Sequence, residues 1–246
     1  MVRRLFKLGL LGVVAVIGLE AAYAALRPVP EQPEFDPSGE FGDRKHATLK
    51  VAVLGDSSIT APGVADPDQI WVRILVRRMS IERHVVLNSV AVGGATAASV
   101  IAGQLDTAVA WKPDLVLVSV GANDAIHGVP VGRFERDLET IASRLRDSGA
   151  EVVLSGVGDL GTIPRLQPPL RGLATRRSLA YDRTHQRVAE RVGALWLNPR
   201  QDDRELWIRD RSLWSEDLFH VSAHGHTRWA EFSWNTLQPV MARLNG

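Results

Sequence analysis

The chain has 246 residues, of which 45% are apolar and 23% charged, and this is the composition of an ordinary globular protein. Its 29 basic and 28 acidic residues leave a formal charge of +1, so it lacks the uniform basic field with which general nucleic-acid binders neutralise phosphates. The absence of cysteine excludes disulfides, cysteine zinc sites, iron–sulfur clusters and thiol nucleophiles. Because the net charge is close to zero, we expect no nucleic acid among the partners.

Residues 1–26 contain the three parts of a secretory signal. A basic start precedes the uncharged run Leu8–Leu19, and small residues follow with an Ala-x-Ala site that ends at Ala24. If Glu20 is tolerated, residues 5–26 have instead the length of one membrane span. A cleaved signal peptide and a retained membrane anchor both stay open, and both predict a protein outside the cytoplasm, secreted or attached to the cell membrane.

Residues 27–47 are predicted to form an exposed, stiff linker, because the stretch from Arg27 to Lys45 has four prolines and several charges but no apolar period. The single domain is expected to span residues 48–246. There, short apolar runs alternate with longer amphipathic ones, a pattern typical of a parallel sheet covered on both faces by helices. We predict strands at Leu49–Leu54, Val85–Val90, Leu115–Val120, Val152–Leu154 and Ala194–Leu197.

Helices are expected between these strands. The apolar spacing favours helices over Gln69–Ile81 and Phe134–Leu145, and Gly149 is a plausible stop for the second. A last helix is predicted from about His224 to Leu244, with a kink at Pro239.

Small and polar residues follow three of the predicted strands, at the sheet edge where ligands bind in such folds. These turns are Gly55-Asp56-Ser57-Ser58, Gly93-Gly94-Ala95-Thr96 and Gly121-Ala122-Asn123-Asp124. A fourth polar group, Asp217-Leu218-Phe219-His220, precedes the last helix. The sequence thus predicts one pocket that gathers a hydroxyl, an imidazole and several amide donors.

A serine becomes a nucleophile when a histidine held by a carboxylate takes its proton. The spacing of Asp217 and His220 allows this pairing, with Ser57 as the nucleophile. The negative charge that develops on an ester carbonyl needs preorganised donors. The candidates are the backbone N–H groups of Ser57 and Gly94 and the side-chain amide of Asn123.

Each group alone has a plainer interpretation. Gly-Asp-Ser is most often a turn, Asp-x-x-His is most often a surface pair, and Asp56 and Asp124 are expected to orient turns rather than react. Ser58 is also a possible nucleophile on composition alone. The occurrence of all the groups in order, three of them after predicted strands, favours the catalytic interpretation.

This constellation resembles the SGNH (GDSL) hydrolase family. The resemblance assigns the four residues that name the family to Ser57, Gly94, Asn123 and His220, with Asp217 completing the triad. It covers about residues 50–235 and includes the proline-rich segment Ile163–Arg171, which is similar to one in actinobacterial members. It implies a flavodoxin-like three-layer α/β/α sandwich on a five-stranded parallel sheet. It also implies ester or acyl hydrolysis without a metal or organic cofactor. It does not fix the substrate, and small-molecule, lipid and glycan esters all stay open.

The chain departs from the family pattern near the predicted site. His-Pro and Gly-Tyr are common in such enzymes, whereas this chain has His220-Val221 and Gly225-His226. The residues after the nucleophile are the bulkier Ile59-Thr60-Ala61-Pro62. These changes bear on the shape of the acyl pocket and the setting of His220.

Other functions remain open on sequence alone. Asp217, His220, His224 and His226 are close enough in sequence to suggest a metal site, although no His-Glu-x-x-His pattern is present. A nucleotide binder is disfavoured because both glycine-rich phosphate-binding patterns are lacking. The same fold also serves non-catalytic tethered binding proteins, and the same acyl-enzyme serves acyltransferases or deacetylases of envelope glycans. Trp207 and Trp214 are expected in the core, with an acyl or sugar site as the alternative.

Overall fold

The computed structural model describes residue 12, residues 15–23, residue 26 and residues 33–244. Much of the predicted signal or anchor, and the first part of the predicted linker, lie outside the described residues. Residues 15–23 are helical. No helix in the described part of the chain is both long and apolar enough to cross a membrane.

A six-stranded sheet forms the centre of the molecule. Its strands are β1 (Gly39–Phe41), β2 (Thr48–Gly55), β3 (His84–Ser89), β4 (Leu115–Ser119), β5 (Glu151–Ser155) and β6 (Leu195–Leu197). The spatial order is β1-β3-β2-β4-β5-β6. Strands β2 to β6 are parallel and keep the flavodoxin-like order, which confirms the expected fold.

Strand β1 corrects the expected count of five strands and pairs antiparallel with β3. It lies inside residues 27–47, so the structure places a sheet edge within the segment that the sequence predicts to be a linker. Phe41 of β1 is 9% exposed and contacts the guanidinium of Arg73, 4.8 Å from the ring centroid. The domain as observed therefore begins before residue 48.

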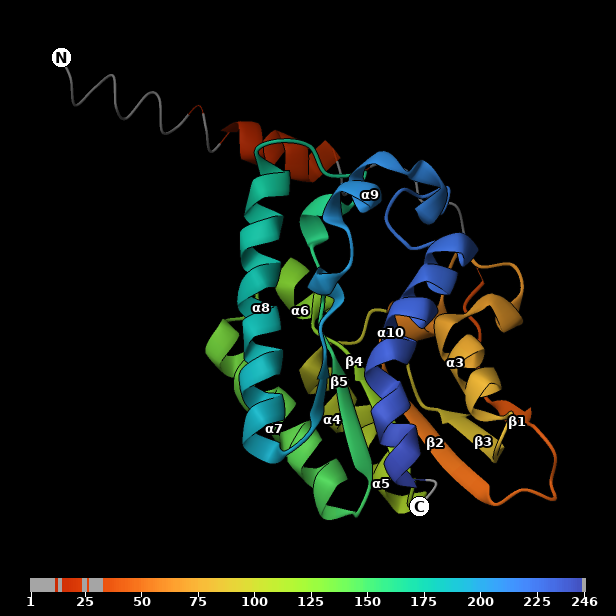
Figure 1. Cartoon of the computed structure of the whole chain (residues 1–246). Helices are drawn as coiled ribbons and strands as arrows, with labels where there is room; N and C mark the ends of the chain where they lie inside the picture. Colours follow the sequence, from red (N-terminus) through yellow and green to blue (C-terminus); the bar gives the residue numbers. More distant parts are fainter. Residues whose placement is uncertain (1–11, 13–14, 24–25, 27–32, 245–246) are drawn as a thin grey trace.

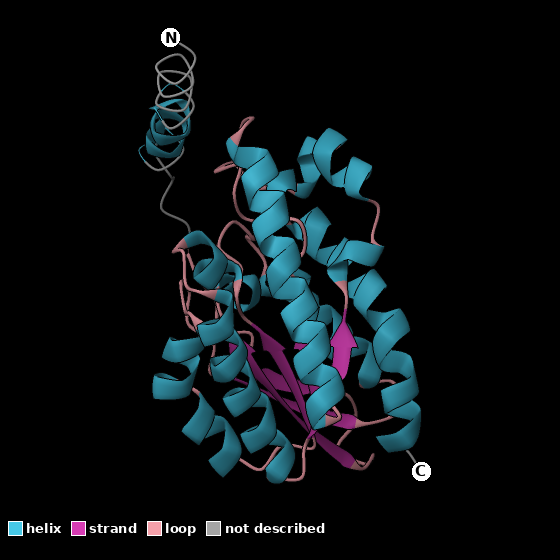
Figure 2. Cartoon of the chain, turned by 90° about the vertical axis from the view of Figure 1, so that its left-hand side faces the viewer, coloured by secondary structure: helices cyan, strands magenta, loops and turns pink. Residues whose placement is uncertain are grey.

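Two helical layers cover the sheet (Figures 1 and 2). Helices α3 (Trp71–Met79) and α10 (Ala223–Leu244) pack on one face, and α4 (Ala97–Gly103), α5 (Leu105–Ala110), α7 (Val131–Asp147) and α8 (Leu170–Val192) pack on the other. Alternate residues of β2 belong to opposite cores: Val51 and Val53 to the first, Ala52 and Leu54 to the second. Both faces of this strand are buried, which explains its continuous apolar run.

The predicted helices occur with small changes in their ends. Helix α7 is followed by Gly149, whose φ of 93° lies in the left-handed region that favours glycine after a helix. Helix α10 continues through Pro239. Shorter helices lie at the carboxyl edge of the sheet: α2 (Ser57–Thr60), α6 (Ala122–Ile126), α9 (Arg204–Arg209) and the 3-10 turns Pro67–Gln69, Leu160–Thr162, Pro199–Gln201 and Arg211–Leu213.

Candidate active site

Ser57 stands at the first position of α2, directly after the end of β2. Gly55 has a φ of 149°, and a Cβ atom there would overlap the carbonyl of Ser119, so glycine is required where the chain leaves the sheet. Asp56 caps α2 and accepts a hydrogen bond from the N–H of Ser58 at 2.9 Å. The Gly-Asp-Ser sequence thus builds a tight exit that places Ser57 at the carboxyl edge of β2.

Asp217 and His220 form a compact turn before α10. The Nδ1 atom of His220 lies 2.6 Å from Oδ2 of Asp217. The other carboxylate oxygen accepts from the hydroxyl of Ser215 at 2.6 Å and from the N–H groups of Phe219 and His220 at 2.8 and 2.9 Å. The contact directs Nε2 of the imidazole away from the carboxylate, which suits a general base.

The electrostatics of Asp217 match this role. Burial alone would raise the pKa of this carboxyl, but the hydrogen bonds from His220, Ser215 and the backbone outweigh burial and hold the pKa well below its usual range. Asp217 is therefore ionised across the physiological range and stabilises a proton that arrives on His220.

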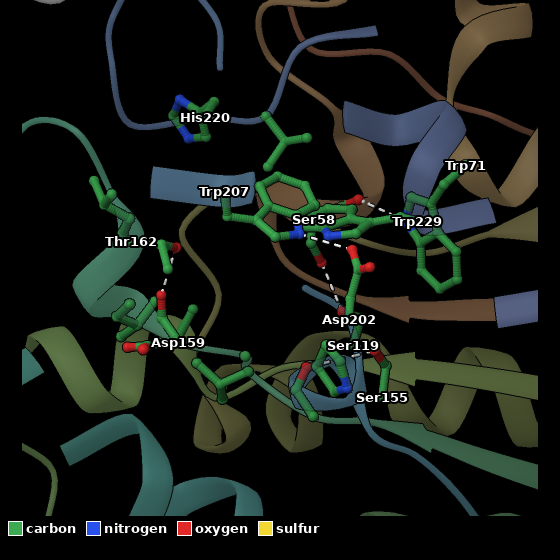
Figure 3. A pocket seen from close by; sticks show the side chains of 18 of the residues that line it. Ser58, Trp71, Ser119, Ser155, Asp159, Thr162, Asp202, Trp207, His220 and Trp229 are labelled. Atoms are coloured by element: carbon green, nitrogen blue, oxygen red, sulfur yellow. Dashed lines mark hydrogen bonds between the residues drawn. The ribbon is translucent and has the colours of Figure 1, made fainter. Parts of the chain in front are cut away.

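Ser57 and His220 line one cavity of about 260 Å³. Aromatic rings form much of its wall, among them Trp71, Trp207 and Trp229 (Figure 3). The cavity reaches along the sheet edge past the ends of β4 and β5, at Ser119 and Ser155. The structure thus brings together two predicted catalytic residues that are distant in sequence, with Asp217 behind the histidine.

Asn123 lies on α6, just after the end of β4, and is not among the residues that line the cavity. Its Nδ2 atom donates to the carbonyl of Ala95 at 3.1 Å and to Oδ2 of Asp56 at 3.3 Å. Both amide hydrogens have partners, and the longer contact is the one to Asp56. The amide therefore joins the turns after β2, β3 and β4.

Gly94 has a φ of 75°, and a Cβ atom there would meet nothing within 4 Å. The backbone conformation therefore favours glycine at this position, whereas close packing against the protein does not require it. Gly94 does not belong to the cavity lining.

Ser58, the alternative nucleophile, has a different setting. Its hydroxyl lies 2.7 Å from the hydroxyl of Ser119 at the end of β4, and its carbonyl accepts from Nε1 of Trp71 at 2.8 Å (Figure 3). These contacts hold Ser58 in the floor of the cavity.

Two buried carboxylates support the turns. Burial raises the pKa of Asp56 to about 6, against the lowering effect of its hydrogen bonds from Ser58. Asp124 is fully buried, and one of its oxygens accepts from the N–H of Ala97 at 3.0 Å. Asp56 and Asp124 both accept hydrogen bonds from backbone N–H groups of the turns after the strands, and they thereby fix the conformation of those turns.

The histidines after His220 are separated. His224 is exposed and pairs with the hydroxyl of Ser212 at 2.9 Å, whereas His226 is 1% exposed and accepts from the N–H of Trp71 at 3.4 Å. Burial, and then the proximity of His220, lower the pKa of His226 to about 3. Among the residues that the structure describes, no cluster of three or more His, Asp or Glu side chains could hold a metal.

Trp207 and Trp214 are both nearly buried, and both line the cavity. Their rings meet edge to face, with centroids 5.5 Å apart, and Nε1 of Trp207 donates to Asp202 at 2.8 Å. The core and pocket interpretations therefore both apply. Ser215, whose hydroxyl donates to the Asp217 carboxylate, is a site residue that was not predicted from the sequence, and its place two residues before Asp217 is the signal that could have indicated it.

Comparison with known proteins identifies the family. The family model for GDSL-like lipases and acylhydrolases matches residues 53–228, which include the Ser57 turn and the Asp217–His220 turn. The chain belongs to the GDSL-like lipase/acylhydrolase family.

The GDSL-like chain is similar to two bacterial esterases. It is 31% identical over 203 residues to the GDSL-like esterase Rv1075c of Mycobacterium tuberculosis, an alignment that covers 78% of this chain and 63% of that protein. It is 32% identical over 113 residues to the esterase TesA of Pseudomonas aeruginosa, covering 45% of this chain and 55% of TesA. The alignments thus span less than two thirds of these relatives. The first relative agrees with the expected similarity to actinobacterial members.

Solved structures share the fold of the GDSL-like chain. A crystal structure of TesA superposes with a TM-score of 0.65 at 27% identity, covering 78% of this chain and 99% of that one. The esterase EstA from Pseudoalteromonas gives 0.62 at 20% identity, covering 80% of this chain and 99% of EstA. The second likeness shows the fold alone.

Proposed function

We propose that the protein is a carboxylic ester hydrolase that uses Ser57 as its nucleophile. One observation carries the proposal: Ser57 and a histidine already paired with a buried carboxylate line the same cavity. Membership of the GDSL-like lipase/acylhydrolase family supports the same chemistry.

The first step forms an acyl-enzyme. The Ser57 oxygen attacks the acyl carbon while Nε2 of His220 takes the hydroxyl proton, and the ionised Asp217 stabilises the imidazolium. The N–H groups of Ser57 and Gly94 and the amide of Asn123 are the donors for the oxyanion. When the tetrahedral intermediate collapses, His220 returns the proton to the departing alcohol.

The second step releases the acid. Water enters the cavity and loses a proton to His220, and the resulting hydroxide attacks the acyl carbon bound to Ser57. Collapse of this intermediate returns the proton to the serine oxygen. The residues in these roles suffice for hydrolysis without a bound cofactor.

The cavity wall suggests the kind of acyl group. Trp71, Trp207, Trp214 and Trp229 line the same cavity as Ser57, and burial of apolar surface against such rings stabilises a bound chain or ring. A volume of about 260 Å³ suits a short or medium acyl group rather than a long one. We therefore propose esters of short to medium apolar acids as substrates.

The kinetic test uses a matched pair of variants on a series of activated esters with graded acyl length. Ser57→Ala should lower kcat by at least about a thousandfold, while Ser58→Ala should stay within about tenfold of wild type because its hydroxyl faces Ser119. Equal losses in the two variants would contradict Ser57 as the nucleophile. A rate that rises steadily to the longest chains would contradict the proposed acyl class.

We also propose an extracytoplasmic location. The basic start and the apolar run Leu8–Leu19 support export. Fractionation of cells that express the full chain, with the mass of the mature protein, tests this: protein outside the cytoplasm supports export, and cytoplasmic protein contradicts it. The mass then distinguishes a cleaved signal from a retained anchor.

A further inference from the structure

The proline-rich segment after β5 contacts the Asp217–His220 turn. Arg165 of this segment is 6% exposed, and its Nη1 donates to the carbonyl oxygen of Asp217 at 3.0 Å. Its backbone N–H donates to the carbonyl of Leu218 at 3.1 Å. Arg165 thus donates hydrogen bonds to the carbonyls of two consecutive residues of the turn, one from its side chain and one from its backbone.

Arg165 supports from outside a turn that contains a residue with strained backbone geometry. Leu218 has a φ of 59°, a conformation that costs a non-glycine residue about 1–2 kcal/mol. The hydrogen bonds to the Asp217 carboxylate all come from residues 215–220 themselves. They fix the carboxylate against the imidazole, but they do not place the turn relative to α2, which carries Ser57.

The segment around Arg165 is itself held in place. Ile163 is 5% exposed and belongs to a small apolar cluster with Trp214 and Val221, which flank the turn on either side. Residues 214 and 221 also form an antiparallel bridge. Arg165 therefore links the turn to a segment that is packed into this apolar cluster.

We propose that Arg165 is a positioning residue for catalysis: it sets the placement of the Asp217–His220 turn relative to Ser57, which lines the same cavity as His220. The guanidinium reaches a peptide carbonyl and not the carboxylate, so its effect is geometric. Arg165 is not among the residues that line the cavity. This inference rests on the proposed function, since it assigns Arg165 a role only in a reaction that uses His220.

Such a role predicts a specific kinetic pattern. A displacement of the base by about 1 Å costs up to about a hundredfold in rate. Arg165→Met should therefore lower kcat about 10- to 100-fold at an unchanged KM. Arg165→Lys keeps one donor to the Asp217 carbonyl and should recover part of the loss.

Arg83→Met is the matched control. Arg83 also donates from its guanidinium to backbone carbonyls, those of Leu244 at 2.8 Å and Ala47 at 3.2 Å, but it belongs to the opposite edge of the sheet at the start of β3. The full-length variants are compared in kcat, KM, thermal midpoint and rate of inactivation by a small serine-reactive phosphonofluoridate. The low-field proton resonance of the His220–Asp217 hydrogen bond gives a spectroscopic readout.

We expect Arg165→Met to lower kcat and the inactivation rate more than Arg83→Met does, although the two variants have similar thermal midpoints. The low-field resonance of Arg165→Met should be shifted or broadened. Wild-type kcat in Arg165→Met would overturn the inference, and so would a loss of kcat equal to that of Arg83→Met. If the methionine variant does not fold, Arg165→Lys decides: a several-fold lower kcat at unchanged KM supports the inference, and wild-type kcat contradicts it. An inactive wild-type protein would instead contradict the proposed function.

Discussion

Asn123 shows how a single side chain links three turns at the site. Its amide donates to Asp56 and to the carbonyl of Ala95, and the 3.3 Å contact to Asp56 is the weaker one. Release of that contact would free one N–H for the oxyanion, since catalytic hydrogen bonds often tighten only in the complex with substrate.

We expect Asn123→Ala to lower kcat by about a hundred- to a thousandfold, the usual cost of one oxyanion donor. Steady-state kinetics on a short activated ester measure this loss. A thermal midpoint near that of wild type shows that the loss does not come from unfolding. A kcat within a few fold of wild type would remove Asn123 from the oxyanion hole and leave it a brace for the turns.

His226 predicts a dependence of stability on pH. Its pKa falls from the usual 6.5 to about 3 in the folded protein, because the ring is buried and lies near His220. Between these values the unfolded chain binds a proton that the folded chain does not, so stability present above pH 6.5 is lost as the pH falls. At pH 5 the loss from this residue is about 2 kcal/mol relative to pH 7.

His226→Gln should abolish this part of the pH dependence. Urea unfolding at pH 7 and pH 5 gives the free energy of unfolding for wild type, for the variant and for His224→Gln, which removes an exposed histidine. We expect the free energy of His226→Gln to fall less between the two pH values than that of the other two proteins. Equal falls in all three would contradict the buried neutral state of His226.

At the scale of elements, the five parallel strands could be predicted because each contains a short, mostly apolar run bounded by turn residues. Strand β1 could not, because its three residues Gly39–Phe41 lie among prolines and charges and carry no periodic signal. It forms through tertiary contacts: pairing with β3 and packing of Phe41 beneath Arg73. Elements this short are fixed by their neighbours rather than by their own sequence.

The same limit applies to the site. Ser57 could be predicted because a serine directly after a strand lies at the edge where ligands bind, and His220 because its spacing from Asp217 suits a catalytic pair. The contact of Arg165 with the Asp217 carbonyl spans 52 residues and involves a peptide group, so no local pattern indicates it. The burial of His226 likewise depends on the packing of α10 against α3 and not on its neighbours in sequence.

Strand β1 also leads to a prediction for truncated chains. A chain that lacks residues 1–47 loses the burial of Phe41 and the edge pairing, whereas one that lacks residues 1–32 keeps both. We expect the shorter chain to be less stable by about 3 kcal/mol, the usual scale for loss of a buried aromatic side chain. Urea unfolding of the two chains measures the difference, and equal midpoints would show that β1 is dispensable.

At the scale of the whole molecule, the parallel sheet explains why remote segments meet. Strands β2, β4 and β5 end at one edge, and residues from all three exits line the cavity together with the turn before α10. The two helical layers bury both faces of the sheet, so this edge is where polar groups and space for a ligand remain. The chemistry therefore depends on the relative placement of α2 and the Asp217–His220 turn.

Covalent labelling of the nucleophile tests the assignment of Ser57 most directly. Wild-type protein treated with a small phosphonofluoridate is digested, and the modified peptide is sequenced by mass spectrometry. We expect one adduct, on the oxygen of Ser57, which is absent in Ser57→Ala and forms much more slowly in His220→Ala. An adduct on Ser58, or ester turnover that persists in Ser57→Ala, would contradict it.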